Sequence, residues 1–168
     1  MSGNVQLIRH RAGALRLRWL PGHLRQLQQL FDQHSSWAQG RSMAQLRRML
    51  ASSQMVVSAW SGGRRRRLVG FGRASSDGVF RAVLWDVVVA KNHQGQGVGR
   101  QLVQALLASR AVAEAERIYL MTTSGNGFYA RLGFEAVQHQ QLMLHQQRSE
   151  AGNAGAEHKE CGDKLPGP

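Results

Sequence analysis

The sequence predicts an α/β domain in which one central sheet carries helices on both faces. Residues 84–107 show the clearest pattern, which is an apolar, β-branched run, a polar turn with three glycines, and an amphipathic helix. Strand patterns mostly precede helical patterns early in the chain and alternate with them later. A chain of 168 residues is long enough for one domain with a real core. These three observations favour a layered α/β structure.

The first half of the chain predicts two strands, two helices and a hairpin. Strand patterns cover Val5–Ile8 and Ala14–Leu20, the second because apolar residues alternate with arginines. Helical spacing begins at His23 and again after Ser42, whose side chain is suited to cap a helix. The hairpin strands then follow, over Met55–Trp60 and Leu68–Arg73.

The second half predicts a long strand at Val79–Ala90, then the glycine turn and a helix that ends near Ala113. The remaining predicted elements are strands and one short helix: strand Arg117–Met121, helix Gly127–Leu132 closed by Gly133, and strands Phe134–Val137 and Gln141–His145. After Ser149 the chain has almost no apolar residues, so we expect a domain over residues 1–148 and a disordered tail over 149–168.

The formal net charge of +12 is concentrated in the domain, because residues 1–149 hold 20 basic and 6 acidic residues. Such a surface attracts anions, among them nucleic acid, acidic proteins and phosphorylated cofactors. A run of four arginines at Arg64–Arg67 is either a solvated hairpin turn or a patch for such partners. No apolar run is long enough to cross a membrane, and the start of the chain has no signal-peptide core. With a single cysteine, Cys161, these features favour a cytoplasmic protein.

The glycine turn predicts an anion site over residues 94–100. The first N–H groups of a helix have no partner within the helix, and glycines let a phosphate approach them closely. The turn ends Gly99-Arg100-Gln101, which lacks the lysine of a nucleoside-triphosphate loop. Its glycine spacing also differs from the dinucleotide fingerprint, and the strand that follows ends without an acidic residue. Another phosphorylated ligand is therefore expected.

Two motifs in order resemble the GNAT superfamily of acetyl-CoA-dependent N-acetyltransferases. The first is Gln94-Gly95-Gln96-Gly97-Val98-Gly99, and the second is Phe128-Tyr129-Ala130-Arg131-Leu132-Gly133-Phe134. The resemblance covers roughly residues 5–147 and implies a mostly antiparallel sheet of about six to seven strands. Within the superfamily, residues 76–97 look most like the plastid and cyanobacterial branch, which includes plant serotonin N-acetyltransferases.

The resemblance implies a site for acetyl-CoA as cosubstrate, without a metal. The pantetheine arm would pair with the backbone of Val87, Val88 and Val89, and an N–H near Val88 would stabilise the oxyanion. The coenzyme pyrophosphate would lie on the turn, formed by Gln94, Gly95, Gln96, Gly97, Val98, Gly99 and Arg100. Many members have an asparagine seven residues before the motif tyrosine, where this chain has Thr122. Asn126 either contacts the coenzyme instead or only caps the short helix.

The resemblance also suggests catalytic residues. Tyr129 matches the residue that protonates the departing thiolate in many members, although it could simply pack with Phe128 and Phe134. Asp86 is either a general base, a ligand for the cationic amine, or a buried carboxylate that pairs with an arginine. Strict alternation would place Asp86 on the face opposite Trp85 and Val87. His93, in the loop, is a second candidate base.

We therefore expect an N-acetyltransferase that uses direct attack of a primary amine on the thioester, with an arylalkylamine such as serotonin as one acceptor class. Protein lysines or N-termini are the alternative acceptors. A non-catalytic basic module for nucleic acid or an acidic partner is the competing function, although nucleic acid is the less favoured ligand. No membrane partner is expected, and the chain would be a monomer or a homodimer.

Overall fold

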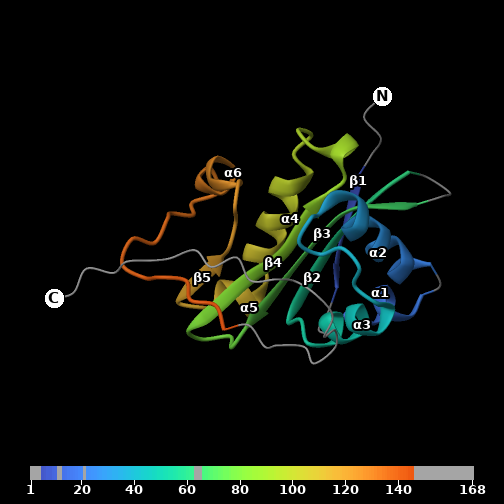
Figure 1. Ribbon diagram of the computed structural model, residues 1–168. Helices are drawn as coiled ribbons and strands as arrows, with labels where there is room; N and C mark the ends of the chain where they lie inside the picture. The colour runs from blue at the N-terminus through green and yellow to red at the C-terminus, as the bar shows by residue number, and fades with distance from the viewer. Residues whose placement is uncertain (1–4, 11–12, 21, 63–65, 146–168) are drawn as a thin grey trace, which may run out of the picture. The chain divides into compact units, whose positions relative to one another are not determined.

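The computed structural model describes residues 5–10, 13–20, 22–62 and 66–145 (Figure 1). The chain divides into two units, residues 1–135 and 136–168. The predicted tail and two residues of the arginine run, Arg64 and Arg65, lie outside the described residues. Within the described residues, no helix has the length and apolar character needed to span a bilayer.

One sheet of five strands organises the first unit. Its strands are β1 (Val5–His10), β2 (Met55–Ser61), β3 (Arg67–Ser76), β4 (Arg81–Val89) and β5 (Arg117–Leu120). They lie side by side in chain order. The first three pairs are antiparallel, and β4 and β5 are parallel. The crossover from β4 to β5 is where the glycine turn and its helix lie.

Helices cover both faces of the sheet (Figure 1). They are α1 (Leu15–Trp19), α2 (His23–His34), α3 (Met43–Ala51), the short 3₁₀ helix η1 (Lys91–His93), α4 (Val98–Leu107), α5 (Arg110–Ala113) and α6 (Asn126–Ala130). Two neighbouring residues of β3 show the two faces. Phe71 packs edge-on against Phe31 of α2 at 5.4 Å, whereas a Cβ at Gly70 would lie 3.0 Å from Leu102 of α4. The core therefore has two layers, one on each side of the sheet.

The fold class is confirmed, as are the helix from His23 and the cap at Ser42. The Ser42 side chain accepts a hydrogen bond from the Gln45 N–H, and the Gln45 side chain accepts one from the Ser42 N–H. This reciprocal pair satisfies two N–H groups that the helix itself leaves free. The predicted strands at Met55–Trp60 and Leu68–Arg73 both form, as parts of β2 and β3.

Four predictions of local structure are wrong. Ala14–Leu20 was expected as a strand and contains helix α1. Phe134–Val137 and Gln141–His145 were expected as strands, but the described residues beyond α6 form none, so the sheet has five strands rather than six to seven. The helix after the glycine turn ends at Leu107, and α5 follows it as a separate turn of helix.

A buried polar group links β1, β2 and α2. The side chains of His10 and Ser58 are buried, and His10 Nε2 lies 2.7 Å from Ser58 Oγ. Trp60 Nε1 donates a hydrogen bond to the same oxygen at 2.8 Å, and the ring of His23 packs on Trp60. Burial, with smaller contributions from the positive charges of His23 and Arg16, lowers the pKa of His10 from 6.5 to about 4.

This shifted pKa predicts an acid-sensitive fold. Because the folded state resists protonation of His10, its stabilising contribution is complete above the unfolded pKa of 6.5 and is lost as pH falls towards about 4. We expect the free energy of unfolding to fall by about 2 kcal/mol from His10 alone between pH 7 and pH 5. Urea unfolding at the two pH values measures this loss, and the His10→Gln variant should show a smaller one. An equal loss in both proteins would contradict the assignment.

Candidate active site

Strand β4 is interrupted by a β-bulge. In the β3–β4 ladder, Phe71 pairs with Val88 and Arg73 pairs with Trp85. One residue lies between these two pairs on β3, whereas two residues lie between them on β4. The two residues on β4 are Asp86 and Val87. Asp86 takes a φ of 52°, in the left-handed region that non-glycine residues seldom adopt. The extra residue therefore disturbs the alternation of side chains along β4.

The bulge corrects one expectation about Asp86. Strict alternation predicts that Asp86 and Trp85 lie on opposite faces, but Arg73 contacts both. Its guanidinium carbon lies 5.6 Å from the centroid of the Trp85 ring, and its Nε lies 2.7 Å from Asp86 Oδ2. Val87 lies on the other face, with Cγ2 3.6 Å from where a Cβ of Gly72 would be. Trp85 and Asp86 therefore share the face that carries Arg73.

Beyond the bulge, β4 loses its partner on the β5 side. The ladder between β4 and β5 ends at the pair Leu84 and Leu120, where β5 itself ends. Among the described residues, no strand continues beside Val87, Val88 and Val89 on that side. The Val88 side chain is buried, so a ligand at this edge meets the strand through its backbone. An extended chain with amide groups could pair with it.

The glycine turn leaves an open cradle at the start of α4. Gly95 and Gly97 have φ values of 74° and 81°, and no atom lies within 4 Å of where their Cβ atoms would be. Gly97 is the N-cap of α4, and its carbonyl accepts the hydrogen bond of the Gln101 N–H. The N–H groups from Val98 to Arg100 precede that first helical bond, and they lie at the positive end of the helix dipole. The cradle therefore suits an anion.

Side chains of the turn hold its shape. Gln94 Nε2 donates to the Val89 carbonyl at 3.0 Å, and Gln96 Nε2 donates to the Asn92 carbonyl at 2.9 Å. His93 Nδ1 lies 2.9 Å from Asn92 Oδ1. Both glutamines are therefore engaged with the turn itself, and Gln94 connects the turn to the end of β4.

Helix α6 rests on the start of α4. A Cβ at Gly99 would lie 3.3 Å from Cζ of Phe128 and 3.6 Å from Cγ2 of Val89. A side chain at this position would therefore crowd the Phe128 ring, and the ring would have to move by a few tenths of an ångström. The second predicted motif therefore lies against the first, and both lie beside the free end of β4.

Tyr129 is held within α6 by aromatic contacts. Its ring lies 4.9 Å from Phe128 and 5.9 Å from Phe134, edge-on in both pairs. A Cβ at Gly125 would lie 2.9 Å from Tyr129 Cε2. Burial raises the pKa of Tyr129 above its usual 10, because the phenolate would lose its hydration. The contacts with Phe128 and Phe134 that were the alternative to a catalytic role are present, and the hydroxyl is protonated at neutral pH, as proton donation requires. The catalytic role of Tyr129 stays a prediction.

Asn126 does not cap the short helix. It is the first residue of α6, and Gly125 is the N-cap, without a side-chain cap. Thr122 takes part in the turn before it, since Thr122 Oγ1 accepts the Gly125 N–H at 2.9 Å. Asn126 is exposed, so contact with the coenzyme stays a prediction for this side chain.

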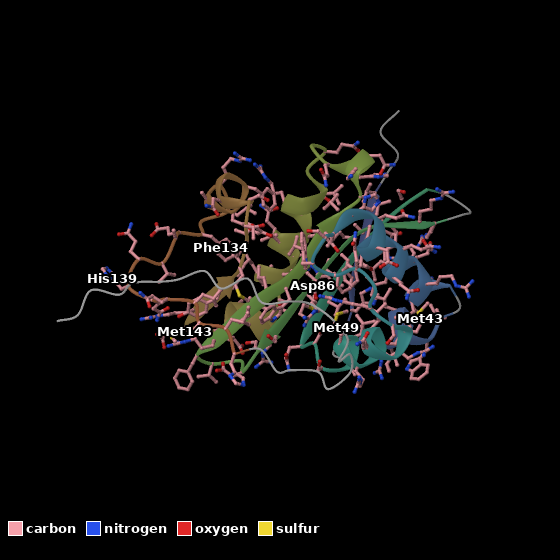
Figure 2. All side chains as sticks on the ribbon, viewed as in Figure 1. Met43, Met49, Asp86, Phe134, His139 and Met143 are labelled. Carbon is pink, nitrogen blue, oxygen red and sulfur yellow. The ribbon has the colours of Figure 1, made fainter. Side chains whose placement is uncertain are left out.

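The Asp86 cluster consists of Asp86, Arg41 and Arg73 on the face opposite α4. Asp86 is labelled in Figure 2, on strand β4. Arg41 donates to Asp86 Oδ1 from Nη1 at 3.1 Å and from Nη2 at 3.2 Å, and Arg73 Nε donates to Oδ2. The Asp86 side chain is only 6% exposed. Of the alternatives for this residue, the structure shows the buried carboxylate paired with arginine.

Sequence reasoning missed the two arginines of this cluster. They lie 45 and 13 residues before Asp86 in the chain, and nothing in the spacing distinguishes them from the many other arginines. Only the folded sheet brings them to one carboxylate.

A model of the acetyltransferase (GNAT) family matches residues 23–134, which include the bulge, the glycine turn and α6. The chain belongs to the GNAT acetyltransferase family. Solved structures share its fold. A GNAT family protein from Streptococcus pneumoniae superposes with a TM-score of 0.68 at 21% identity, over 87% of this chain and all of that one. Rv2747 from Mycobacterium tuberculosis, solved in complex with CoA, superposes at 0.61 with 19% identity, over 81% of this chain and 76% of that one.

Curated GNAT relatives have several names. A rice chloroplastic protein named serotonin N-acetyltransferase 2 is 40% identical over 100 residues, which are 56% of this chain and 48% of that protein. The soybean protein named histone acetyltransferase TAP1 is 36% identical over 105 residues, 57% of this chain and 46% of that one. A Porphyra purpurea protein named N-acetyltransferase ycf52 is 34% identical over 114 residues, 67% and 64% of the two chains. The chain thus spans about half the length of the soybean and rice proteins.

The residues of this GNAT domain fit an acyl-CoA. The open turn presents free helix N–H groups to a pyrophosphate, and the free edge of β4 presents backbone groups to the amides of pantetheine. The predicted residues Val87–Val89 and Gln94–Arg100 all lie along this one path. Their contacts with the coenzyme stay predictions.

A groove elsewhere in the GNAT domain contains none of the predicted site residues. It has a volume of about 1120 Å³ and lies between the edge strand β1 and α4. Its lining includes Gln6, Arg9, Gln101 and Gln104. The candidate active site is thus assigned by the bulge, the turn and α6 rather than by the size of a cavity.

Proposed function

We propose that this chain transfers the acetyl group of acetyl-CoA to a primary amine in a ternary complex. One observation carries the proposal: the free edge of β4 beyond Leu84 leads directly into the open glycine turn. The contact of Phe128 with Gly99 then places the helix of Tyr129 beside both. An edge for amides, a cradle for phosphates and a protonated phenol are the parts that acetyl transfer from a CoA thioester needs.

Acetyl-CoA supplies an activated thioester, whose carbonyl carbon forms the new C–N bond as its C–S bond breaks. The backbone N–H near Val88 donates to the carbonyl oxygen as negative charge develops there. The Tyr129 hydroxyl donates its proton to the departing sulfur, and the proton released by the amine passes to water. Tyr129 then regains a proton from solvent. The net reaction gives an amide and the free thiol.

The pKa of Tyr129 suits this role. Burial raises it above 10, so the hydroxyl holds its proton across the neutral range. The acid is present below this pKa and is lost as pH rises through it. Turnover should therefore not decline through loss of this proton until the pH exceeds 10.

For the acceptor we propose an arylalkylamine, because the rice relative carries the name of a serotonin N-acetyltransferase. The name of the soybean relative supports a lysine side chain as the second candidate. The chain spans about half of each, so both acceptors belong to the proposal. Release of thiol from acetyl-CoA, measured with serotonin, tryptamine, polyamines and lysine peptides, ranks these classes.

Acetyl-CoA should stabilise the protein against heat. A ligand that binds only the folded state at 100 times its Kd adds about 2.7 kcal/mol, which raises the melting temperature by about 5–10 °C. Thermal unfolding with acetyl-CoA, CoA and duplex DNA measures this effect. If DNA shifts the melting temperature in a salt-sensitive way and neither coenzyme does, the chain is a basic binding module and not this enzyme.

A further inference from the structure

The Asp86 cluster connects three segments that are distant in the chain. Asp86 comes from the bulge of β4, Arg73 from β3, and Arg41 from the residues that precede α3. The side chain of Arg73 is 17% exposed and that of Arg41 is 29% exposed, so both ion pairs are largely shielded from water. Shielded pairs with hydrogen bonds of this geometry define positions more strongly than surface pairs do.

The carboxylate of Asp86 has little capacity left for a proton or an amine. A carboxylate offers about four lone-pair positions. Three are occupied here, two on Oδ1 by Arg41 and one on Oδ2 by Arg73. One position on Oδ2 is left, and with the side chain only 6% exposed little of the carboxylate is open to an amine.

The backbone at Asp86 needs such support. A non-glycine residue in the left-handed region costs about 1–2 kcal/mol, and it persists where surrounding contacts hold it. The extra residue here lies next to the pair Leu84–Leu120, where β4 and β5 separate. The cluster therefore holds the strand at the point where its free edge begins.

We propose that Asp86 is a positioning residue: its two arginine pairs hold the bulge, and the bulge directs the backbone of residues 87–89 towards the thioester. The proposal rests on the proposed acetyl transfer at the same site. In this role Asp86 takes no proton from the amine, and Arg73 contributes to turnover as much as Asp86 does.

The test compares Asp86→Asn, Arg73→Gln and the double variant. Each single change should lower kcat about 10- to 100-fold, since misplacement of reacting groups by about 1 Å costs that much. The Kd of acetyl-CoA and the KM of the amine should change less than threefold. The pH profile of kcat/KM should keep its shape, and the double variant should be no slower than the slower single variant, because both changes remove one unit.

A general base would behave differently. Asp86→Asn would then remove the acidic limb of the pH profile, and Arg73→Gln would leave kcat unchanged. Either result overturns the proposal. If Asp86→Asn fails to fold, Arg73→Gln and Arg41→Gln still decide between the two roles.

Amide hydrogen exchange over residues 84–90 provides a readout that does not depend on turnover. In Asp86→Asn these amides should exchange at least tenfold faster than in the parent protein. Unchanged exchange would contradict the proposal that the arginine pairs of Asp86 hold the bulge. Glu114→Gln is the matched control, because Glu114 also pairs with an arginine, Arg110, at 2.9 Å but on an exposed turn of α5. It should change neither exchange nor kcat. If the parent protein binds acetyl-CoA but acetylates no amine, the proposed function is wrong. Hydrogen exchange would then still test whether Asp86 holds the bulge.

Discussion

Replacement of Tyr129 by phenylalanine should lower kcat by about 100- to 10,000-fold, the usual contribution of a positioned general acid. The ring would keep its contacts with Phe128 and Phe134, so the variant loses the hydroxyl and little packing. Acetyl-CoA affinity should stay within about threefold of the parent, since the Tyr129 hydroxyl has no part in the phosphate cradle. Stopped-time assays of thiol release, with calorimetry for the coenzyme, measure the two quantities.

Tyr119→Phe is the control for this experiment, because Tyr119 is the other tyrosine of the chain and lies on β5. Its kcat should equal that of the parent protein. Equal turnover in the parent and in Tyr129→Phe would remove the acid role from Tyr129, unless a step before sulfur departure limits the rate. A solvent isotope effect on kcat shows whether proton transfer limits it.

The candidate site was predictable where its residues are close together in the chain. The end of β4, the glycine turn and the first turn of α4 are contiguous, so their sequence pattern already contains their geometry. Gly95 and Gly97 both have positive φ values, which glycine adopts without a steric penalty. Their identity as glycine therefore already indicated the turn. Resemblance to a family motif then added α6. Its contact with Gly99 needed the folded chain.

The Asp86 cluster was not predictable, because its geometry depends on an insertion that leaves no sequence signal. Alternation assumes an unbroken ladder, and a single extra residue moves a side chain to the other face. In this chain the bulge brings Trp85 and Asp86 to the face of Arg73. An isolated sequence cannot show which residue of a β-branched strand is left unpaired.

Helix α1 shows a different limit. Leu15, Leu17 and Trp19 alternate with arginines, which is the pattern of a half-buried strand. Only Leu17 is buried, however, and Leu15 and Trp19 are more than 60% exposed. One buried residue defines no spacing between buried positions. The pattern of these five residues therefore cannot distinguish a strand from a helix. The Trp19 ring instead lies 5.4 Å from the guanidinium carbons of both Arg18 and Arg47.

The second prediction with a large effect concerns Gly97. Alanine at this position should weaken acetyl-CoA binding by about 10- to 100-fold, equivalent to the loss of one hydrogen bond to a charged group. The added methyl would meet no protein atom within 4 Å, so it would occupy the open cradle itself. The free energy of unfolding should fall by about 1–2 kcal/mol, because the φ of 81° is strained for alanine.

Gly78→Ala separates this strain from the loss of the cradle. Gly78 also has a positive φ, 76°, and no atom within 4 Å of its Cβ position, but it lies in the turn between β3 and β4. Both variants should therefore lose similar stability in urea unfolding, while only Gly97→Ala should lose affinity for acetyl-CoA.

If the two variants bind the coenzyme equally well, the turn is not the pyrophosphate site. If both lose affinity in proportion to stability, backbone strain and not the cradle explains the effect. A loss of affinity confined to Gly97→Ala connects the open space at the N-cap of α4 to the ligand, because conformation and crowding are matched between the two glycines.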